Sequence, residues 1–269
     1  MGIRLIGIDM DGTLLNSEKK LPKENVQAIR EAVAQGVEFA YATGRIGAEM
    51  DEIYRLLPEV RYAILGNGAL VKDLKEKKII YSNRMSMDDV RTLYHTLEDF
   101  DMMFEVFSEE MLAVDKDCYA NPDAYGVGIF RYLIWDTRTP VPSIKEYIDN
   151  REEPVGKINI FFKNTEQRDE AIRLTAHLPF ETSYQEPTNL EYNVCSANKG
   201  NGLQALAEYL GLCKEEVMAI GDNNNDVPML RYAGVAVAMG NAKPEALRCA
   251  DRVVASCDNC GVAEAIRGA

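Results

Sequence analysis

The sequence predicts an α/β protein in which an α+β block interrupts a parallel sheet. Residues 4–44 hold a short apolar run, an amphipathic helix pattern and a second apolar run, which is the spacing of a strand–helix–strand unit with parallel strands. The same alternation returns after residue 199, whereas residues 83–191 combine paired strand patterns with separate helices. We therefore expect a core domain of residues 1–82 and 192–269, and an inserted domain of residues 83–191.

The core elements follow from their apolar patterns and from the residues that begin or end them. The first helix is expected to begin at Pro22, to present Val26, Ile29 and Val33 on one face, and to stop at Gly36. The expected strands are 4–8, 37–42, 62–65, 217–221, 235–237 and 252–254. The other expected helices are 48–57 and 202–210. A hairpin is expected to join residues 69–71 to residues 79–81.

The inserted block begins with a clear helix signal, because Ser86 followed by Asp89 has the form of a capping box. Residues 118–142 are rich in tyrosine, proline and glycine and favour no single element. The aromatic residues of the block are typical of a core rather than of a ligand site. Its expected strands are 102–107, 111–114, 157–162, 182–184 and 191–194, and its expected helices are 86–98, 143–150 and 165–177.

Composition limits the possible partners. The chain has 269 residues, 46% of them hydrophobic, and its 30 basic and 43 acidic residues give a formal charge of −13. Such a charge repels nucleic acid and anionic membrane surfaces, so we expect neither as a partner. The first apolar run is broken by Asp9 and is too short for a signal peptide, and no uninterrupted apolar stretch is long enough to span a membrane.

The six cysteines are scattered, which is typical of the reduced thiols of a cytoplasmic protein. Cys257 and Cys260 have the spacing of a redox or half-zinc motif, but no second such pair exists and neither histidine is near them in sequence. Their role stays open. With only two histidines in the chain, a histidine triad or a multi-histidine metal site is not expected.

Acidic residues follow two of the predicted strands. Asp9 and Asp11 come at the end of the first strand, before a glycine that permits a sharp turn, and Asp222 and Asp226 follow the strand at 217–221. The carboxyl ends of parallel strands meet at one edge of a sheet, so these carboxylates should converge. Oxygen ligands of this kind fit a hard divalent cation, and Mg²⁺ is the usual choice where waters complete the shell.

A calcium loop of the EF-hand type is the rival interpretation, and the sequence excludes it. A loop starting at Asp9 requires glycine and glutamate where the chain has Leu14 and Lys20. A loop starting at Asp222 requires them where the chain has Val227 and Ala233.

Two further positions suggest an anionic ligand. Thr43 and Gly44 lie between a strand end and a helix start, where free N–H groups favour an anion, although a threonine there is also an ordinary helix cap. Lys199 lies at or just before a helix start, where a cation opposes the helix dipole unless it faces carboxylates and an anion. The glycines Gly66 and Gly68 lack the rest of a dinucleotide fingerprint.

These parts, in this order, resemble the four motifs of the haloacid dehalogenase (HAD) superfamily of phosphatases. The matching stretches are Asp9-Met10-Asp11-Gly12-Thr13, Thr43-Gly44-Arg45, Lys199-Gly200 and Gly221-Asp222-Asn223-Asn224-Asn225-Asp226. The position of the insert, with Met239-Gly240-Asn241-Ala242 further on, resembles the Cof-type branch, subfamily IIB. The resemblance covers nearly the whole chain and implies a Rossmann-like parallel-sheet core with a C2B-type cap inserted in it.

The resemblance also implies roles for individual residues. Asp9 would attack phosphorus, and Asp11 would protonate the leaving oxygen and then activate water. The side chains of Asp9 and Asp222 and the backbone carbonyl of Asp11 would bind Mg²⁺, with Asp226 supporting that shell. The groups implied to hold the phosphoryl oxygens are the Met10 backbone, Thr43, Gly44, Lys199 and Asn225, and Arg45 would reach the substrate or the cap.

The expected function is therefore Mg²⁺-dependent hydrolysis of phosphomonoesters of small metabolites, such as sugar phosphates, through an aspartyl-phosphate. The cap would exclude water and select substrates. There are two alternatives. One is a phosphomutase or phosphotransferase on the same scaffold. The other is a non-catalytic sensor that accepts a phosphoryl group or binds Mg²⁺ and an anion. The sequence leaves the substrate open, and we expect a monomer or a weak homodimer.

Overall fold

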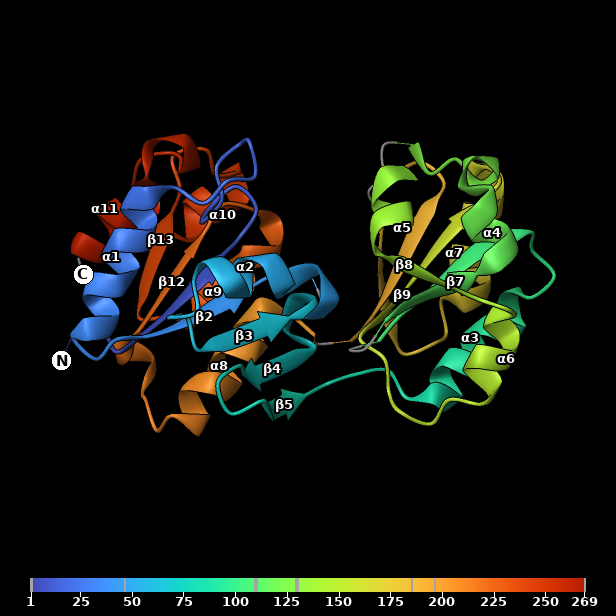
Figure 1. The fold of residues 1–269 in the computed structure, drawn as a ribbon, viewed down its shortest axis with the longest axis horizontal. Coiled ribbons are helices and arrows are strands. Elements are labelled where there is room, and N and C mark those ends of the chain that lie inside the picture. Colours follow the sequence, from blue (N-terminus) through green and yellow to red (C-terminus); the bar gives the residue numbers. More distant parts are fainter. Residues whose placement is uncertain are drawn as a thin grey trace. The chain divides into compact units, whose positions relative to one another are not determined.

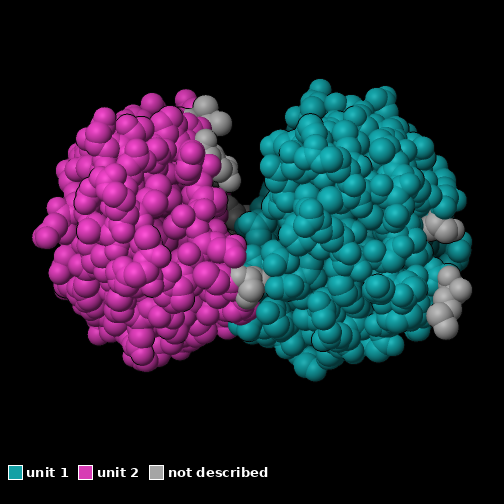
Figure 2. All heavy atoms as spheres, turned by 180° about the vertical axis from the view of Figure 1, so that it is seen from behind, with its two compact units in different colours: residues 1–45, 50–82, 196–269 teal, residues 46–49, 83–195 magenta. Residues whose placement is uncertain are grey.

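The structure is a computed structural model of the chain, and it describes residues 2–45, 47–108, 111–128, 131–184, 186–195 and 197–268. The chain divides into two compact units, coloured separately in Figure 2. Unit 1 is made of Met1–Arg45, Met50–Ser82 and Ser196–Ala269, and unit 2 of Ile46–Glu49 and Asn83–Cys195. Within the described residues, no helix has the length and apolar character needed to cross a membrane.

Unit 1 is built on an eight-stranded sheet with the order β14-β13-β12-β1-β2-β3-β4-β5 (Figure 1). Neighbouring strands from β14 to β3 pair in parallel, and β3, β4 and β5 pair antiparallel. The strands are β1 (Leu5–Asp9), β2 (Glu38–Ala42), β3 (Tyr62–Leu65), β4 (Leu70–Asp73), β5 (Lys78–Ser82), β12 (Val217–Gly221), β13 (Val235–Ala238) and β14 (Arg252–Val253). The predicted parallel sheet and the hairpin after β3 are both confirmed.

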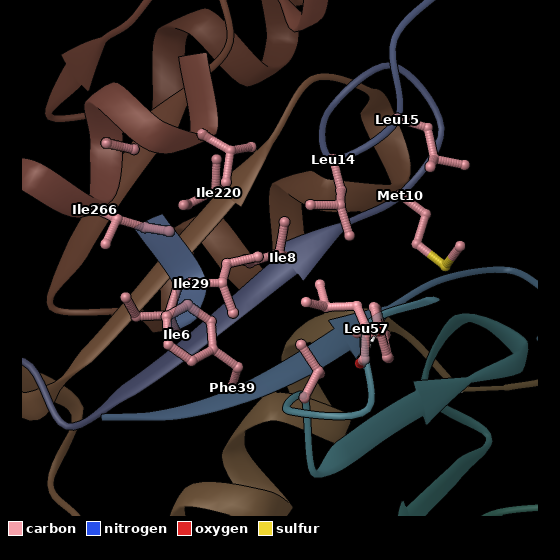
Figure 3. Close-up of a cluster of buried hydrophobic side chains, with 14 of the residues drawn as sticks. Ile6, Ile8, Met10, Leu14, Leu15, Ile29, Phe39, Leu57, Ile220 and Ile266 are labelled. Carbon is pink, nitrogen blue, oxygen red and sulfur yellow. Dashed lines mark hydrogen bonds between the residues drawn. The ribbon is translucent and has the colours of Figure 1, made fainter. Parts of the chain in front are cut away.

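Helices cover both faces of this sheet, as expected where the central parallel strands are buried and largely apolar. Helices α1 (Lys23–Ala34) and α11 (Gly261–Arg267) pack together on one face (Figure 1). The core on that face includes Ile6, Ile8, Ile29, Phe39, Ile220 and Ile266 (Figure 3). Helices α8 (Lys199–Tyr209), α9 (Val227–Tyr232) and α10 (Pro244–Cys249) pack on the other face, and α2 (Asp51–Leu56) follows β2.

The central strand β1 shows why the layers fit closely. All five of its residues are buried, and Ile6 and Ile8 face the layer of α1 and α11 while Leu5 belongs to the core on the other face. A side chain at Gly7 would place its Cβ 3.0 Å from a methyl carbon of Leu203 in α8. The glycine therefore lets α8 approach the strand that carries Asp9.

Unit 2 has a six-stranded sheet with the order β10-β11-β9-β6-β7-β8, antiparallel except for the pair β7 and β8. Its strands are β6 (Met102–Phe107), β7 (Leu112–Asp115), β8 (Arg138–Val141), β9 (Lys157–Phe162), β10 (Phe180–Ser183) and β11 (Asn189–Val194). Its helices are α3 (Met87–Leu97), α4 (Lys116–Ala120), α5 (Arg131–Thr137), α6 (Ile144–Asp149) and α7 (Thr165–Thr175). This confirms an α+β arrangement.

The two faces of the unit 2 sheet differ in chemistry. Helices α3, α6 and α7 pack on an apolar face that includes Phe104 and Ile160. On the other face Glu105, fully buried, accepts hydrogen bonds from Arg138 Nε at 2.9 Å and from Asn159 Nδ2 at 2.7 Å. The buried charges are thus paired, as a stable interior requires.

Several predicted elements differ from the structure in detail. The buried stripe of α1 is Asn25, Ala28, Ile29 and Ala32, whereas Val26 and Val33 are only partly buried. The helix expected at 48–57 is a 3₁₀ helix, Gly47–Met50, followed by α2. The expected cap at Ser86 is confirmed, because its side chain accepts a hydrogen bond from the backbone of Asp89.

Candidate active site

The carboxyl ends of β1 and β12 bring three carboxylates together. Asp9 ends β1, Asp222 follows β12 directly, and Asp226 lies in the next 3₁₀ helix. Each offers a carboxylate oxygen, and these oxygens all lie within 4.8 Å of one another. The parallel register of β1 and β12 places their ends side by side, so the convergence expected from the sequence is present.

Lys199 is the cation at the centre of this group. It is the first residue of α8 and is fully buried, and its Nζ donates to Asp9 Oδ1 at 2.5 Å and to Asp226 Oδ1 at 2.6 Å. Burial by itself lowers the pKa of Lys199, but the two carboxylates outweigh burial and raise it. The lysine therefore stays charged, and it does not point into solvent.

One lysine does not balance three carboxylates. Burial, opposed by Lys199, raises the pKa of Asp9 to about 8, and burial together with Asp226 raises the pKa of Asp222. Two neighbouring carboxylates with raised pKa values require a proton or a cation between them. The donor set at Asp9 and Asp222, all hard oxygen atoms, fits a divalent cation such as Mg²⁺.

Asp226 differs from the other two carboxylates in its partners. Its Oδ2 accepts the backbone N–H groups of Asp222 and Asn223, both at 2.9 Å, and its Oδ1 accepts from Lys199. Both of its oxygens are thus engaged by the protein. The side chain shapes the loop that carries Asp222, which fits a supporting position better than a ligand position.

The turn after Asp9 is held against Asp222. Thr13 Oγ1 donates to Asp222 Oδ1 at 2.8 Å. Gly12 has a φ of +92°, and a Cβ there would lie 2.6 Å from Asp222 Oδ2, so only glycine allows this approach. Asn241 Nδ2 donates to the carbonyl of Gly12 at 2.8 Å, and the N–H of Lys243 donates to the carbonyl of Asp222 at 2.7 Å.

Asp11 points to two basic side chains. Arg45 forms a two-pronged contact with its carboxylate, from Nε at 3.0 Å and from Nη2 at 2.7 Å, and Lys19 Nζ donates to it at 2.9 Å. Burial acts to raise the pKa of Asp11, but these hydrogen bonds outweigh it and hold the pKa below its usual value. Asp11 is therefore ionised in this arrangement.

The predicted anion-binding residues lie on neighbouring loops of unit 1. Thr43, buried, follows β2, and its Oγ1 accepts the backbone N–H of Arg45 at 3.1 Å. The Thr43 side chain thus closes a local turn and does not cap a helix, because the next helix begins only at Gly47. Asn225 is exposed, and its Nδ2 donates to Asn67 Oδ1 at 3.1 Å. The side chain of Met10 is fully buried in the core.

Sequence reasoning gave no role to four residues that hold this arrangement: Lys19 and Asn67, and also Thr13 and Asn241, which it named only as members of motifs. The backbone of Asn67 is in the left-handed region, with a φ of 53°, and its side chain accepts a hydrogen bond from Asn225. The same side chain lies beside Gly44, because a Cβ added to Gly44 would be 3.2 Å from Asn67 Nδ2. The backbone N–H of Asn67 donates to the carbonyl of Thr43 at 2.9 Å. An asparagine between two glycines is a usable signal, because asparagine tolerates left-handed backbone.

Comparison with known proteins gives consistent matches. The sequence pattern of haloacid dehalogenase-like hydrolases matches residues 6–266. The chain is 31% identical to Phosphatase YwpJ of Bacillus subtilis, over 98% of this chain and 99% of that protein. It is 32% identical to the 5-amino-6-(5-phospho-D-ribitylamino)uracil phosphatase YcsE of Bacillus subtilis, over 98% of this chain and 95% of that protein.

Among solved structures, the chain is similar to the HAD subclass IIB sugar phosphatase BT4131, with a TM-score of 0.77 and 25% sequence identity. The similarity covers 98% of each chain. The likeness therefore extends over both units, and not over the carboxylate site alone.

Proposed function

The chain belongs to the haloacid dehalogenase-like hydrolase family. We propose that it hydrolyses phosphate esters by forming a phosphorylated Asp9 as an intermediate, with Mg²⁺ as cofactor. It is an enzyme, a phosphatase that acts on small phosphorylated metabolites, as the relatives of similar length indicate. The observation that supports the proposed chemistry best is the convergence of Asp9 and Asp222, at the ends of neighbouring strands, with Lys199 at the start of α8.

In the first step, a carboxylate oxygen of Asp9 attacks the phosphorus of the ester. The bond between phosphorus and the leaving oxygen breaks, and Asp11 gives its proton to that oxygen, so an alcohol leaves. Lys199, 2.5 Å from Asp9, holds the attacking group in place and offsets negative charge on the phosphoryl oxygens. The product is an acyl phosphate on Asp9.

In the second step, Asp11 takes a proton from water as the water oxygen attacks the phosphorus of the acyl phosphate. The bond between phosphorus and the Asp9 oxygen breaks, which releases inorganic phosphate and restores the carboxylate. The contacts from Arg45 and Lys19 keep Asp11 ionised, which is the form that this step requires. For the first step Asp11 must carry a proton, and the charge of an incoming phosphate group favours that by raising its pKa.

The metal site in this proposal consists of the Asp9 and Asp222 side chains and the Asp11 carbonyl. When bound, Mg²⁺ offsets the charge of the carboxylates and of the phosphoryl group. Asp226 supports the site by fixing the backbone N–H groups around Asp222 and by holding Lys199. Thr43, Gly44, Asn225 and the Met10 backbone are proposed to bind the phosphoryl oxygens.

We assign unit 2 the role of a cap that limits which esters are hydrolysed. The residues proposed for catalysis all lie in unit 1, so a separate unit with its own core is available for selection. Sugar phosphates and sugar-alcohol phosphates are the proposed substrates. The names of BT4131, a sugar phosphatase, and of YcsE, a phosphatase of a ribityl phosphate, support this choice.

The test is phosphate release from a panel of sugar phosphates, polyol phosphates, nucleotides and an aryl phosphate, with Mg²⁺ and with a chelator. We expect release that requires Mg²⁺ and is fastest for sugar or polyol esters. Release that persists in the chelator would contradict the metal assignment. Formation of an isomerised sugar phosphate in place of free phosphate would show a mutase.

A further inference from the structure

Two basic side chains, Lys19 and Arg45, contact one carboxylate, that of Asp11. Arg45 donates to both oxygens of Asp11, and Lys19 donates to Oδ1 at 2.9 Å. The carboxylate balances only one of the two positive charges. Within this group of three side chains, one positive charge is therefore in excess, in a chain whose net charge is −13.

Lys19 is held in place by a tightly bonded turn. Its φ is 59°, in the left-handed region that strains a lysine, and its N–H donates to the carbonyl of Asn16 at 2.9 Å. The Asn16 side chain accepts the backbone N–H groups of Glu18 at 3.1 Å and Lys20 at 2.8 Å. The turn positions the Lys19 ammonium against Asp11.

Stability does not explain this contact. The Lys19 side chain is 63% exposed and that of Asp11 is 36% exposed, and ion pairs so open to water add little to folding. The exposed ammonium instead remains accessible to a ligand. The Arg45 side chain is 30% exposed, and its Nη2 donates to the same oxygen of Asp11, Oδ1, that Lys19 contacts.

Both cations lie close to the expected leaving group. Under the proposed function, Asp11 is within hydrogen-bond reach of the leaving oxygen, and it is also hydrogen-bonded to Arg45 and Lys19. Two such contacts in series put each cation within about 6 Å of that oxygen. An anionic group two or three bonds from the leaving oxygen falls within that distance.

We propose that Lys19 and Arg45 form an anion subsite next to the scissile bond. This subsite favours phosphate esters whose leaving alcohol carries a second negative charge, as a carboxylate or a second phosphate does. The inference rests on the proposed function and narrows its substrate class. It assigns part of the selectivity to a turn of unit 1, in addition to the role given to unit 2.

The experiment compares two phosphonates that cannot be hydrolysed, 3-phosphonopropionate and 3-phosphonopropanamide. In the second compound a neutral carboxamide replaces the carboxylate, and the phosphonate group is unchanged. The binding of both compounds is measured by calorimetry with Mg²⁺ present, on the wild type and on Lys19→Gln. The matched control is Lys20→Gln, because Lys20 is the next residue and its ammonium pairs with Glu18 at 2.7 Å. Thermal unfolding of each variant shows that the fold is kept.

We expect the wild type and Lys20→Gln to bind the carboxylate about tenfold more tightly than the amide, and Lys19→Gln to reduce this ratio to about threefold or less. A wild type that does not discriminate, or a ratio unchanged in Lys19→Gln, overturns the subsite. If neither phosphonate binds and no ester releases phosphate with Mg²⁺, the proposed function fails as well. Phosphate release without discrimination between the phosphonates overturns the subsite alone.

Discussion

Lys199 shows how one side chain can hold an acidic site together. We expect Lys199→Met to abolish phosphatase activity and to lower the free energy of unfolding by about 3 kcal/mol, because Asp9 and Asp226 then remain buried without their cation. Chemical denaturation without metal measures this change. An unfolding free energy equal to that of the wild type would contradict the pairing.

A double variant separates the charge effect from a packing effect. Adding Asp226→Asn to Lys199→Met removes one of the two unpaired charges, while the asparagine oxygen can still accept the N–H groups of Asp222 and Asn223. We expect about half of the lost stability to return, and no activity. If the double variant is less stable than Lys199→Met, the cost lies in packing.

The proposed nucleophile has its own test. Asp9→Asn keeps the size of the side chain but removes the attacking carboxylate, so phosphate release should fall by roughly 10³-fold or more. Stability should be unchanged or higher, since a buried charge is removed. The control is Asp99→Asn, which makes the same change at an exposed carboxylate of unit 2. Wild-type turnover by Asp9→Asn would show that Asp9 is not the nucleophile.

At this scale the sequence reveals the charged groups but not their partners. Asp9 and Asp222 could be placed at strand ends because the apolar runs before them are unmistakable. The contact of Lys19 with Asp11 could not be predicted, because it depends on a left-handed turn. Asn67 was missed for a similar reason, since its contact with Asn225 joins loops 158 positions apart in the chain.

At the scale of elements, the turn after β3 packs against the start of α8. A Cβ on Gly68, whose φ is +96°, would lie 2.0 Å from the carbonyl oxygen of Asn198, the residue before Lys199. We expect Gly68→Ala to cost about 3 kcal/mol of stability, because backbone atoms cannot move aside cheaply. Activity should fall with it, since the start of α8 positions Lys199.

Gly211→Ala is the matched control for this prediction. Gly211 also has a positive φ, of +68°, but an added Cβ there meets nothing within 4 Å. It should cost only about 1 kcal/mol, the strain of the backbone itself. Equal losses in the two variants, measured by denaturant unfolding, would show that the close approach at Gly68 does not matter.

Elements with a clean apolar period were predictable, and irregular ones were not. Strand β12 and helix α3 carry apolar residues with the correct spacing and a clear cap or end. Residues 118–142 gave no pattern, because α4, α5 and β8 are short and packing decides their form. The face of α1 was misjudged because the buried Asn25 binds the carbonyl of Leu14 and the N–H of Ala263, which a hydrophobic pattern does not reveal.

At the scale of the whole molecule, the two units have separate cores, and the acidic site belongs to unit 1 alone. Mg²⁺ should therefore slow backbone hydrogen exchange in β1, β12 and α8 and leave β6 and β9 nearly unchanged. At a concentration about 100 times the dissociation constant, the added stability is about 2.7 kcal/mol. Exchange measured with Mg²⁺ and with a chelator tests this.

The matched control for hydrogen exchange is Asp222→Asn, which removes a proposed ligand. In this variant Mg²⁺ should no longer protect unit 1. Equal protection of both units in the wild type would place the cation elsewhere, or would show that the units unfold as one.

The strand order also has a consequence for synthesis on the ribosome. Strand β1 pairs with β2 on one side and with β12 on the other, and unit 2 is encoded between them. At 5–20 residues per second, about 200 residues must be translated before β12 can follow β1, which takes roughly 10–40 s. For that time one edge of β1, with Asp9 at its end, has no permanent neighbour and is open to wrong pairing. The strand that carries the proposed nucleophile is therefore exposed to mispairing until β12 has been translated and can pair with it.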